Sequence, residues 1–268
     1  MKTYRQAFEE LRAKREGALI AFTVIGDPDY NTSLKIAKKI ADAGADMLEL
    51  GLAFSDPIAD GPTIQEADMR ALECGINTDR AFSFVKEIRK RTKIPIGLLC
   101  YYNLVYQRGI KKFYEDSRKA GVSSILIADM PIEESDEAAM HSKANSIDTV
   151  FMASPLTDDE RIKKIALKVT GFVYVVSRLG ITGARSSMEK SALEFVKRMR
   201  RLTDKPLCVG FGISKPMHVK SFINAGADGA IVGSAIVNII SKNLGDKEKM
   251  LNEVYEYVKS MKLSTKQT

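Results

Sequence analysis

Short apolar segments and amphipathic segments alternate along the whole chain. The apolar segments are rich in β-branched residues and leave no face for water, which is typical of buried parallel strands covered by helices. The predicted strands are Leu19–Val24, Asp46–Gly51, Ile94–Leu99, Ser123–Ala128, Thr149–Met152, Phe172–Val176, Leu207–Gly210 and Gly229–Gly233. Between them, apolar residues recur at three- and four-residue spacing and predict helices. These helices include Asn31–Ala43, Thr78–Arg91, Ile110–Ala120, Asp158–Lys168, Met188–Leu202 and Pro216–Ala225.

Eight strand-and-helix units in 268 residues match the size of a closed (β/α)8 barrel, an α/β fold of about 250 residues. The pattern leaves an open, doubly wound sheet as the alternative. Further helices are predicted at Tyr4–Arg15, which would close the bottom of the barrel, and at Gly245–Met261. Because no linker or change in composition divides the chain, we expect a single barrel domain over residues 1–268.

A weak internal repeat favours the barrel. Each copy ends a helix with a glycine and then enters an apolar strand, as a short helix-to-strand turn requires. The copies are Ala43–Gly51 (AGADMLELG), Ala120–Ala128 (AGVSSILIA) and Ala225–Gly233 (AGADGAIVG).

Composition narrows the possible functions. The chain carries 41 Lys and Arg against 34 Asp and Glu, a net charge of +7. The basic residues lie between apolar positions of predicted helices, which indicates a solvated outer face rather than a nucleic-acid surface. A modest basic excess also suits a phosphorylated substrate. The longest mostly apolar segment, Gly229–Ile240, is shorter than the roughly 20 residues of a membrane span. The widely spaced Cys74, Cys100 and Cys208 predict neither a disulfide framework nor a zinc site and favour the cytoplasm.

The active face of a barrel is formed by the C-terminal ends of its strands, and few reactive side chains are predicted there. No lysine lies in a predicted strand or directly after one, so a Schiff-base nucleophile is not indicated. His141 and His218 both fall in helical segments, which argues against a histidine-rich metal site.

Glu49 is the outstanding candidate, because it lies inside an apolar strand. Burial raises the pKa of a carboxyl group into the range of a general acid and base near neutral pH. The alternative is a structural glutamate bonded to a neighbouring strand. Asp56 and Asp60 follow in the long connection Leu52–Pro62, where Asp before Pro or Gly is also ordinary turn chemistry.

Glycine-rich loops follow three of the later strands, at Gly180–Gly183, Gly210–Ser214 and Gly233–Ala235. Their backbone N–H groups, together with a short helix predicted to begin at Ser234, would form a phosphate cradle. The alternative is that these glycines only permit tight turns. Apolar side chains near the strand ends would complete a slot for a flat apolar group. They are Phe22, Leu99, Tyr101, Leu126, Tyr174 and Phe211.

Several of these segments together resemble the tryptophan synthase α chain family, in the right order and over nearly the whole chain. The most specific is Leu48–Gln65 (LELGLAFSDPIADGPTIQ), which contains both Glu49 and Asp60. The other matching segments are Gly97–Val105, Ala128–Ser135, Ser177–Gly183, Gly210–Pro216 and Gly229–Ala235.

The resemblance implies a lyase that cleaves indole-3-glycerol phosphate into indole and glyceraldehyde 3-phosphate in tryptophan biosynthesis. By motif position, Glu49 would be the acid–base catalyst and Asp60 its partner at the indole nitrogen. The phosphate site would include Gly183, Gly212, Gly233 and Ser234. The residues around the remainder of the substrate would be Phe22, Leu99, Tyr101, Tyr174, Thr182 and Phe211.

The resemblance also implies a partner and the absence of a cofactor in this chain. The family forms an αββα complex with a β subunit that binds pyridoxal phosphate and receives indole through a tunnel. Two alternatives remain open at this point. One is another enzyme on a phosphate-binding barrel, although the synthase chemistry of the same pathway requires a lysine at a strand end. The other is a subunit that mainly binds and activates a β partner.

Overall fold

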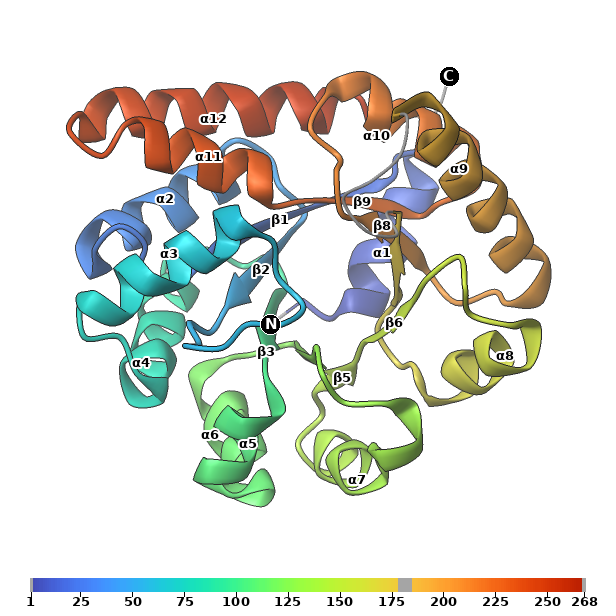
Figure 1. The fold of residues 1–268 in the computed structure, drawn as a ribbon, viewed down its shortest axis with the longest axis horizontal. Coiled ribbons are helices and arrows are strands. Elements are labelled where there is room, and N and C mark those ends of the chain that lie inside the picture. The colour runs from blue at the N-terminus through green and yellow to red at the C-terminus, as the bar shows by residue number, and fades with distance from the viewer. Residues whose placement is uncertain (1, 178–184, 267–268) are drawn as a thin grey trace.

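Parallel strands form one closed barrel ringed by helices, as Figure 1 shows in a view along the barrel. The computed structural model describes residues 2–177 and 185–266, without the side chains of 185–189. The strands follow the order β5-β4-β3-β2-β1-β9-β8-β7-β6 around the sheet. They are β1 Ala18–Val24, β2 Met47–Gly51, β3 Ile96–Cys100, β4 Ser124–Ile127, β5 Asp148–Thr149, β6 Phe151–Ala153, β7 Val173–Val176, β8 Leu207–Gly210 and β9 Gly229–Val232.

The barrel closes at its fifth strand position. The predicted strand Thr149–Met152 is divided at Val150 into two short pieces, which corrects the expectation of one continuous strand. β5 pairs with β4 and β6 pairs with β7, so one short segment bonds first to one neighbour and then to the other. The third strand begins two residues later than predicted, at Ile96, because Pro95 has no N–H for the ladder. The predicted closed (β/α)8 barrel is confirmed.

The helices cover the outside of the barrel and, at α1, its bottom. Among the helices whose preceding residue is described, several follow a Thr, Asp or Asn whose side chain accepts the N–H three residues on: Thr3, Asp29, Asn77, Asp158 and Asp246. The helices are α1 Tyr4–Ala13, α2 Tyr30–Asp42, α3 Pro62–Glu73, α4 Thr78–Arg89, α5 Tyr102–Arg108, α6 Ile110–Ala120, the 3-10 turn η1 Ile132–Glu134, α7 Asp136–Ala144, α8 Asp159–Lys168, α9 Arg185–Leu202, α10 Pro216–Asn224, α11 Ser234–Lys242 and α12 Lys247–Leu263.

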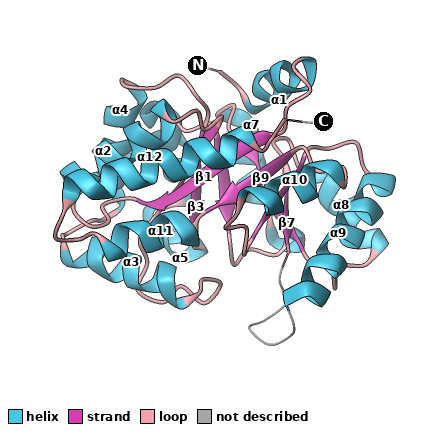
Figure 2. Ribbon diagram, turned by 90° about the horizontal axis from the view of Figure 1, so that it is seen from above, coloured by secondary structure: helices cyan, strands magenta, loops and turns pink. Residues whose placement is uncertain are grey.

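Helix α1 closes the bottom of the barrel, as the sequence predicts. Figure 2 shows α1 at one end of the barrel and α5 at the other. Tyr4 is buried, and its ring packs against Phe172 with centroids 5.6 Å apart. Burial raises the pKa of Tyr4, and Ser124 beside its hydroxyl opposes that rise. A Cβ at Gly97 would lie 2.7 Å from that hydroxyl, so the glycine makes room for the tyrosine.

The three repeat copies share one device at the bottom of the barrel. In each copy, the side chain of the fourth residue accepts a hydrogen bond from one backbone N–H group. That N–H group lies at or near the start of the neighbouring strand of the barrel. Asp46 accepts from Leu19 (2.7 Å) and Asp228 from Leu207 (2.9 Å). Ser123 does the same for Ile96 (3.3 Å). The repeat therefore joins neighbouring strands at their N-terminal ends.

Candidate active site at the strand ends

Glu49 lies in the middle of β2 and inside the barrel. Its register partners are Phe22 on β1 and Gly97 on β3. The residue is only 4% exposed, and its Oε2 has no hydrogen-bond partner among the residues that the structure describes. Burial, and to a smaller extent the nearby Asp60 carboxylate, raises the pKa of Glu49 to about 8. The side chain is therefore protonated at neutral pH and close to its titration point.

Asp60 lies opposite in the connection between β2 and α3 and has its own donor. The hydroxyl of Tyr101 donates to Asp60 Oδ2 at 2.6 Å. The backbone N–H of Ala59 donates in turn to the Tyr101 hydroxyl at 3.1 Å. Phe54 stacks on the Tyr101 ring with centroids 5.1 Å apart. Burial raises the pKa of Asp60, and the bond from Tyr101 opposes that rise by favouring the ionised form.

Apolar side chains surround these two carboxyl groups. Phe22 lies between Gly51 and Gly233, since a Cβ at either glycine would come within 3.0 Å of its ring. Tyr174 contacts Phe211 edge to face at 5.8 Å, and the charges of Glu49 and Asp60 raise its pKa further beyond the effect of burial. Leu99 is buried beside Gly51 in the register of β2 and β3. The structure therefore brings Phe22, Leu99, Tyr101, Tyr174 and Phe211 to the same end of the barrel as Glu49.

Two of the three predicted glycine loops are described, and both adopt conformations suited to an anion. After β8, Phe211 (φ 65°) and Gly212 (φ 94°) are both left-handed. The hydroxyl of Ser177 donates to the carbonyl groups of Gly210 and Phe211 and holds this loop. After β9, Gly233 caps α11, which begins at Ser234 as predicted, so the first N–H groups of the helix face the strand ends. Thr182 and Gly183 lie outside the described residues.

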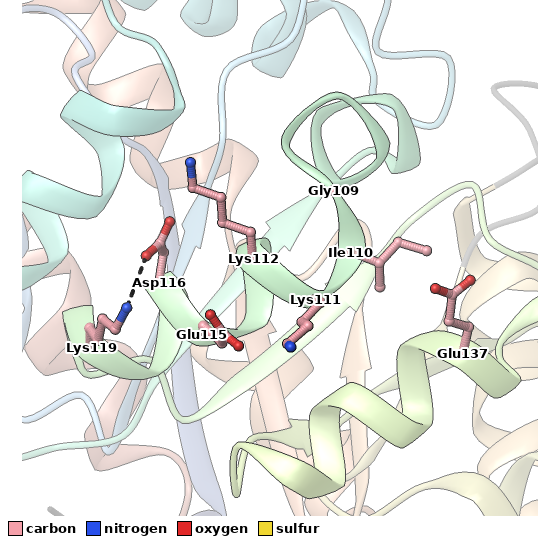
Figure 3. A pocket seen from close by; sticks show the side chains of 8 residues that line it. All are labelled: Gly109, Ile110, Lys111, Lys112, Glu115, Asp116, Lys119 and Glu137. Atoms are coloured by element: carbon pink, nitrogen blue, oxygen red, sulfur yellow. Dashed lines mark ion pairs between the residues drawn. The ribbon is translucent and has the colours of Figure 1, made fainter.

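One hollow on the outer surface of the protein lies away from the strand ends. Figure 3 shows this hollow of about 490 Å³, where Lys119 pairs with Asp116 at 3.7 Å. It is lined by Gly109, Ile110, Lys111, Lys112, Glu115, Asp116, Lys119 and Glu137, all of them on or beside α6 and α7. None of these residues lies at a strand end. Within the described ranges there is no group of three or more side chains that could hold a metal ion. The helices of the described part include none long and apolar enough to cross a membrane.

Sequence reasoning did not identify Asp68, a further carboxyl group near the site. Asp68 is 4% exposed on the inner face of α3, and the carboxylates of Asp60 and Asp27 add to the effect of burial on its pKa. A signal was present in the sequence. Ile64, Ala67 and Ala71 form the apolar stripe of this helix, and Asp68 occupies a position on that stripe.

Comparisons with known proteins agree with this geometry. The family model for the tryptophan synthase alpha chain matches residues 8–266. The tryptophan synthase alpha chain of Methanothermobacter thermautotrophicus is 47% identical over 96% of this chain and 95% of its own length.

Solved structures give the same result. Tryptophan synthase subunit alpha from Legionella pneumophila aligns with a TM-score of 0.89 and 29% identity, over 99% of this chain and 98% of that one. A chain of the tryptophan synthase complex from Pyrococcus furiosus aligns with a TM-score of 0.83 and 39% identity, over 92% of this chain and 98% of that one. The chain belongs to the tryptophan synthase alpha chain family.

Proposed function

We propose that this chain is the α subunit of a tryptophan synthase and cleaves indole-3-glycerol phosphate to indole and glyceraldehyde 3-phosphate, a carbon–carbon lyase reaction of tryptophan biosynthesis. One observation carries the proposal above all others. A buried carboxyl group with a pKa of about 8, Glu49, lies close to the carboxylate of Asp60 at the mouth of the barrel. Membership of the family supports the same reaction.

The reaction needs an electron sink, and the indole ring provides one after it is protonated. Protonated Glu49 gives its proton to C3 of the indole ring, and the ring becomes an iminium ion. The Glu49 carboxylate then takes the proton from the hydroxyl group on the adjacent side-chain carbon. The bond from C3 to that carbon breaks, its electron pair returns to the ring, and the side chain leaves as an aldehyde. One carboxyl group thus serves as acid and then as base, and it ends the cycle protonated.

Asp60 stabilises the positive charge that develops on the ring nitrogen. An ionised carboxylate is needed for this role, and the hydrogen bond from Tyr101 favours that form. Phe22, Leu99, Tyr174 and Phe211 supply the apolar walls of the indole site.

The glycine loops bind the phosphate group. The left-handed backbone at Gly212 and the N-terminus of α11 at Gly233 and Ser234 offer N–H donors to its oxygens. We assign Thr182 and Gly183 to the same substrate site because of the motif in which they stand. This chain needs no cofactor for these steps.

The partner is the β subunit of tryptophan synthase, which carries pyridoxal phosphate and receives indole in an αββα complex. Two segments at the mouth support docking there. Ile58 in the connection that carries Asp60 is 83% exposed, and Tyr106 on α5 is 64% exposed. Because docking orders the first of these segments, it places Asp60 and raises turnover without adding a catalytic group. The whole chain acts as one barrel domain, and its cysteine usage suits the cytoplasm.

The test is indole formation from indole-3-glycerol phosphate by the purified full chain, with and without the β subunit. We expect slow release of indole and glyceraldehyde 3-phosphate in equal amounts by the chain alone, and faster release in the complex. Asp60→Asn should lower turnover at least about tenfold in both assays. The exposed Glu66→Gln on α3 is the matched control and should match the native rates. No cleavage in either assay would overturn the proposal and leave a subunit that only binds.

A further inference from the structure

Asp129 follows the end of β4 at the mouth of the barrel and has no part in the reaction steps proposed above. Its Oδ1 accepts the backbone N–H of Tyr102 at 2.7 Å. Tyr102 is the first residue of α5, and the first N–H groups of a helix have no partner within the helix itself. The side chain of Asp129 is exposed, so we expect this hydrogen bond, rather than packing, to be its main contribution.

The neighbouring strands β3 and β4 bring these two residues together. Cys100 and Ile127, the last residues of the two strands, are register partners. Directly after them, the N–H of Ala128 donates to the carbonyl group of Cys100 at 2.8 Å. The bond from Tyr102 to Asp129 therefore adds one further link between the two segments beyond the ends of the strands.

Tyr101 lies between the end of β3 and the start of α5, and its side chain holds the connection that carries Asp60. The hydroxyl group donates to Asp60 Oδ2 at 2.6 Å and accepts the N–H of Ala59 at 3.1 Å. The ring stacks on Phe54 with centroids 5.1 Å apart. Tyr101 is only 2% exposed. Three positions of the connection between β2 and α3 thus depend on where this one side chain lies.

Both peptide groups that flank Tyr101 are bonded to the segment after β4. The carbonyl group on its N-terminal side, that of Cys100, accepts the N–H of Ala128. The N–H on its C-terminal side, that of Tyr102, donates to Asp129. Because each peptide group is planar, these two bonds fix the backbone on both sides of the Tyr101 Cα. The hydroxyl group is the far end of the side chain, so a small rotation of this backbone displaces it and the carboxylate that it holds.

We propose that Asp129 is a positioning residue for the lyase reaction: it fixes the backbone at Tyr101, and the Tyr101 hydroxyl then holds the carboxylate of Asp60 at the indole nitrogen. This inference rests on the role of Asp60 proposed above. Asp129 acts through Tyr101 and not on the substrate itself. Asp60 stabilises a charge that develops only during the reaction, so a loss of its position lowers kcat more than it raises KM.

The test compares replacements of Asp129 that keep or remove the acceptor. Asp129→Ala removes it, and kcat for indole release by the full chain should fall about tenfold, because misplacing a reacting group by about 1 Å can cost about 10²-fold. KM should stay within about twofold of native, since the apolar walls and the glycine loops remain. Asp129→Asn removes the charge but keeps an acceptor oxygen, so its kcat should stay within about twofold of native. Asp129→Leu has nearly the shape of Asn without an acceptor and should match Asp129→Ala.

A double variant shows whether Asp129 acts through the Tyr101 hydroxyl. Tyr101→Phe removes this hydroxyl and keeps the ring, so its kcat should fall at least as far as that of Asp129→Ala. When Asp129→Ala is added to Tyr101→Phe, kcat should fall by less than about twofold more, because both changes release the same carboxylate.

A helix cap at the other end of the barrel provides the matched control. Thr3 Oγ1 accepts the N–H of Gln6 at 3.2 Å at the start of α1. Thr3→Ala should lower the unfolding temperature, as the loss of a cap does, and leave kcat at the native value. Thermal melts of all variants separate a loss of stability from a loss of kcat in the folded enzyme.

The outcomes separate this inference from the assignment on which it rests. Native kcat in Asp129→Ala, equal losses in Asp129→Asn and Asp129→Ala, or losses that multiply in the double variant would overturn it. Failure of both the Ala and the Leu variant to fold would also overturn it, because the residue would then serve the fold. If Asp60→Asn retained native turnover, the role of Asp60 itself would be wrong. If Asp60→Asn were slow and Asp129→Ala had the native kcat, only the role of Asp129 would be wrong.

Discussion

Buried acidic side chains have opposite surroundings at the two ends of the barrel. At the bottom, Asp46 binds Lys262 at 2.9 Å and accepts the N–H of Leu19, and Asp228 binds Arg12 and Arg200. At the mouth, Glu49 and Asp68 face other carboxyl groups instead of cations. The same chemical group is therefore neutralised by a partner at one end and by its own proton at the other.

The difference shows how one fold separates stability from chemistry. A paired carboxylate contributes to the folded state but has no proton to exchange near neutral pH, whereas an unpaired buried one costs stability and gains a useful pKa. Asp46 illustrates the intermediate case, since burial raises its pKa while Lys262 and the N–H of Leu19 lower it. Asp27 shows that position alone does not decide the outcome. It lies at the mouth, yet Arg70 holds it as an ion pair.

The largest effect should follow from Glu49→Gln. The amide keeps the shape of the side chain but cannot transfer the proton, so kcat for indole release should fall by about 10²–10⁴-fold. In the native enzyme, activity should fall as the pH rises through about 8, because the protonated form of Glu49 starts the reaction. Steady-state assays across pH measure both. Near-native turnover in Glu49→Gln would make the catalytic assignment wrong.

Glu49→Gln also tests how the buried, unpaired carboxyl group affects the stability of the folded protein. The pKa of Glu49 is higher in the folded state than in the unfolded chain. Its stabilising contribution is therefore fully present below about pH 4.5 and is lost as the pH rises toward about 8. Glu49→Gln should unfold at nearly the native temperature at pH 4.5 and above it at pH 7.5. Thermal melts at the two pH values, monitored by circular dichroism, measure the unfolding temperatures. If the difference between variant and native protein were the same at both pH values, the buried Glu49 would not be protonated in the way described here.

Asp46→Ala should produce the converse result at the bottom of the barrel. It removes one of the two carboxylate partners of Lys262, leaving Glu16, and it removes the acceptor for the Leu19 N–H. Both groups are partly buried, so the free energy of unfolding should fall by about 2 kcal/mol. The kcat of the folded enzyme should stay within about twofold of native. Denaturant unfolding and indole assays measure the two effects. The exposed pair of Asp42 and Lys38 on α2 provides the control, and Asp42→Ala should cost less than about 0.5 kcal/mol.

The sequence predicts the mouth of the barrel better than the way in which its charges interact. Glu49 stands out because a charged residue in an apolar strand is conspicuous, and a strand without a polar face predicts that all its side chains are buried. Asp68 falls on the apolar stripe of α3, which predicts its burial, but the sequence does not specify which charged groups of the barrel it meets. The division at Val150 likewise depends on where the two ends of the sheet meet, which is a property of the whole barrel. The roles of Glu49, Asp60 and the glycines stay predictions.

Gly212→Ala should weaken substrate binding with little effect on the chemical step. Its left-handed φ of 94° strains any residue with a Cβ by about 1–2 kcal/mol and shifts the loop, so KM should rise roughly tenfold while kcat changes little. Gly233→Ala should act in the same direction, since its Cβ would lie 3.0 Å from Phe22 Cδ1. Gly245→Ala is the control, because a Cβ there meets nothing within 4 Å. Inorganic phosphate at millimolar concentration should compete with the substrate in native protein and less well in Gly212→Ala.

The smallest effect should come from Ser123→Ala, which tests whether the repeat joins strands through charge or through hydrogen bonding. Ser123 takes the position of Asp46 and Asp228 in its copy and accepts the Ile96 N–H at 3.3 Å, without a charge and without a cation. Its loss leaves one buried N–H without its acceptor, which should cost about 1 kcal/mol and leave kcat and KM unchanged. Denaturant unfolding beside Asp46→Ala measures the comparison directly. A cost equal to that of Asp46→Ala would mean that the backbone acceptor provides the stability in all copies and that Lys262 adds little. If Ser123→Ala lowers the free energy of unfolding less than Asp46→Ala does, the difference between the two losses is the contribution of the ion pair with Lys262. Glu49 and Asp68 at the mouth of the barrel have no such ion pair.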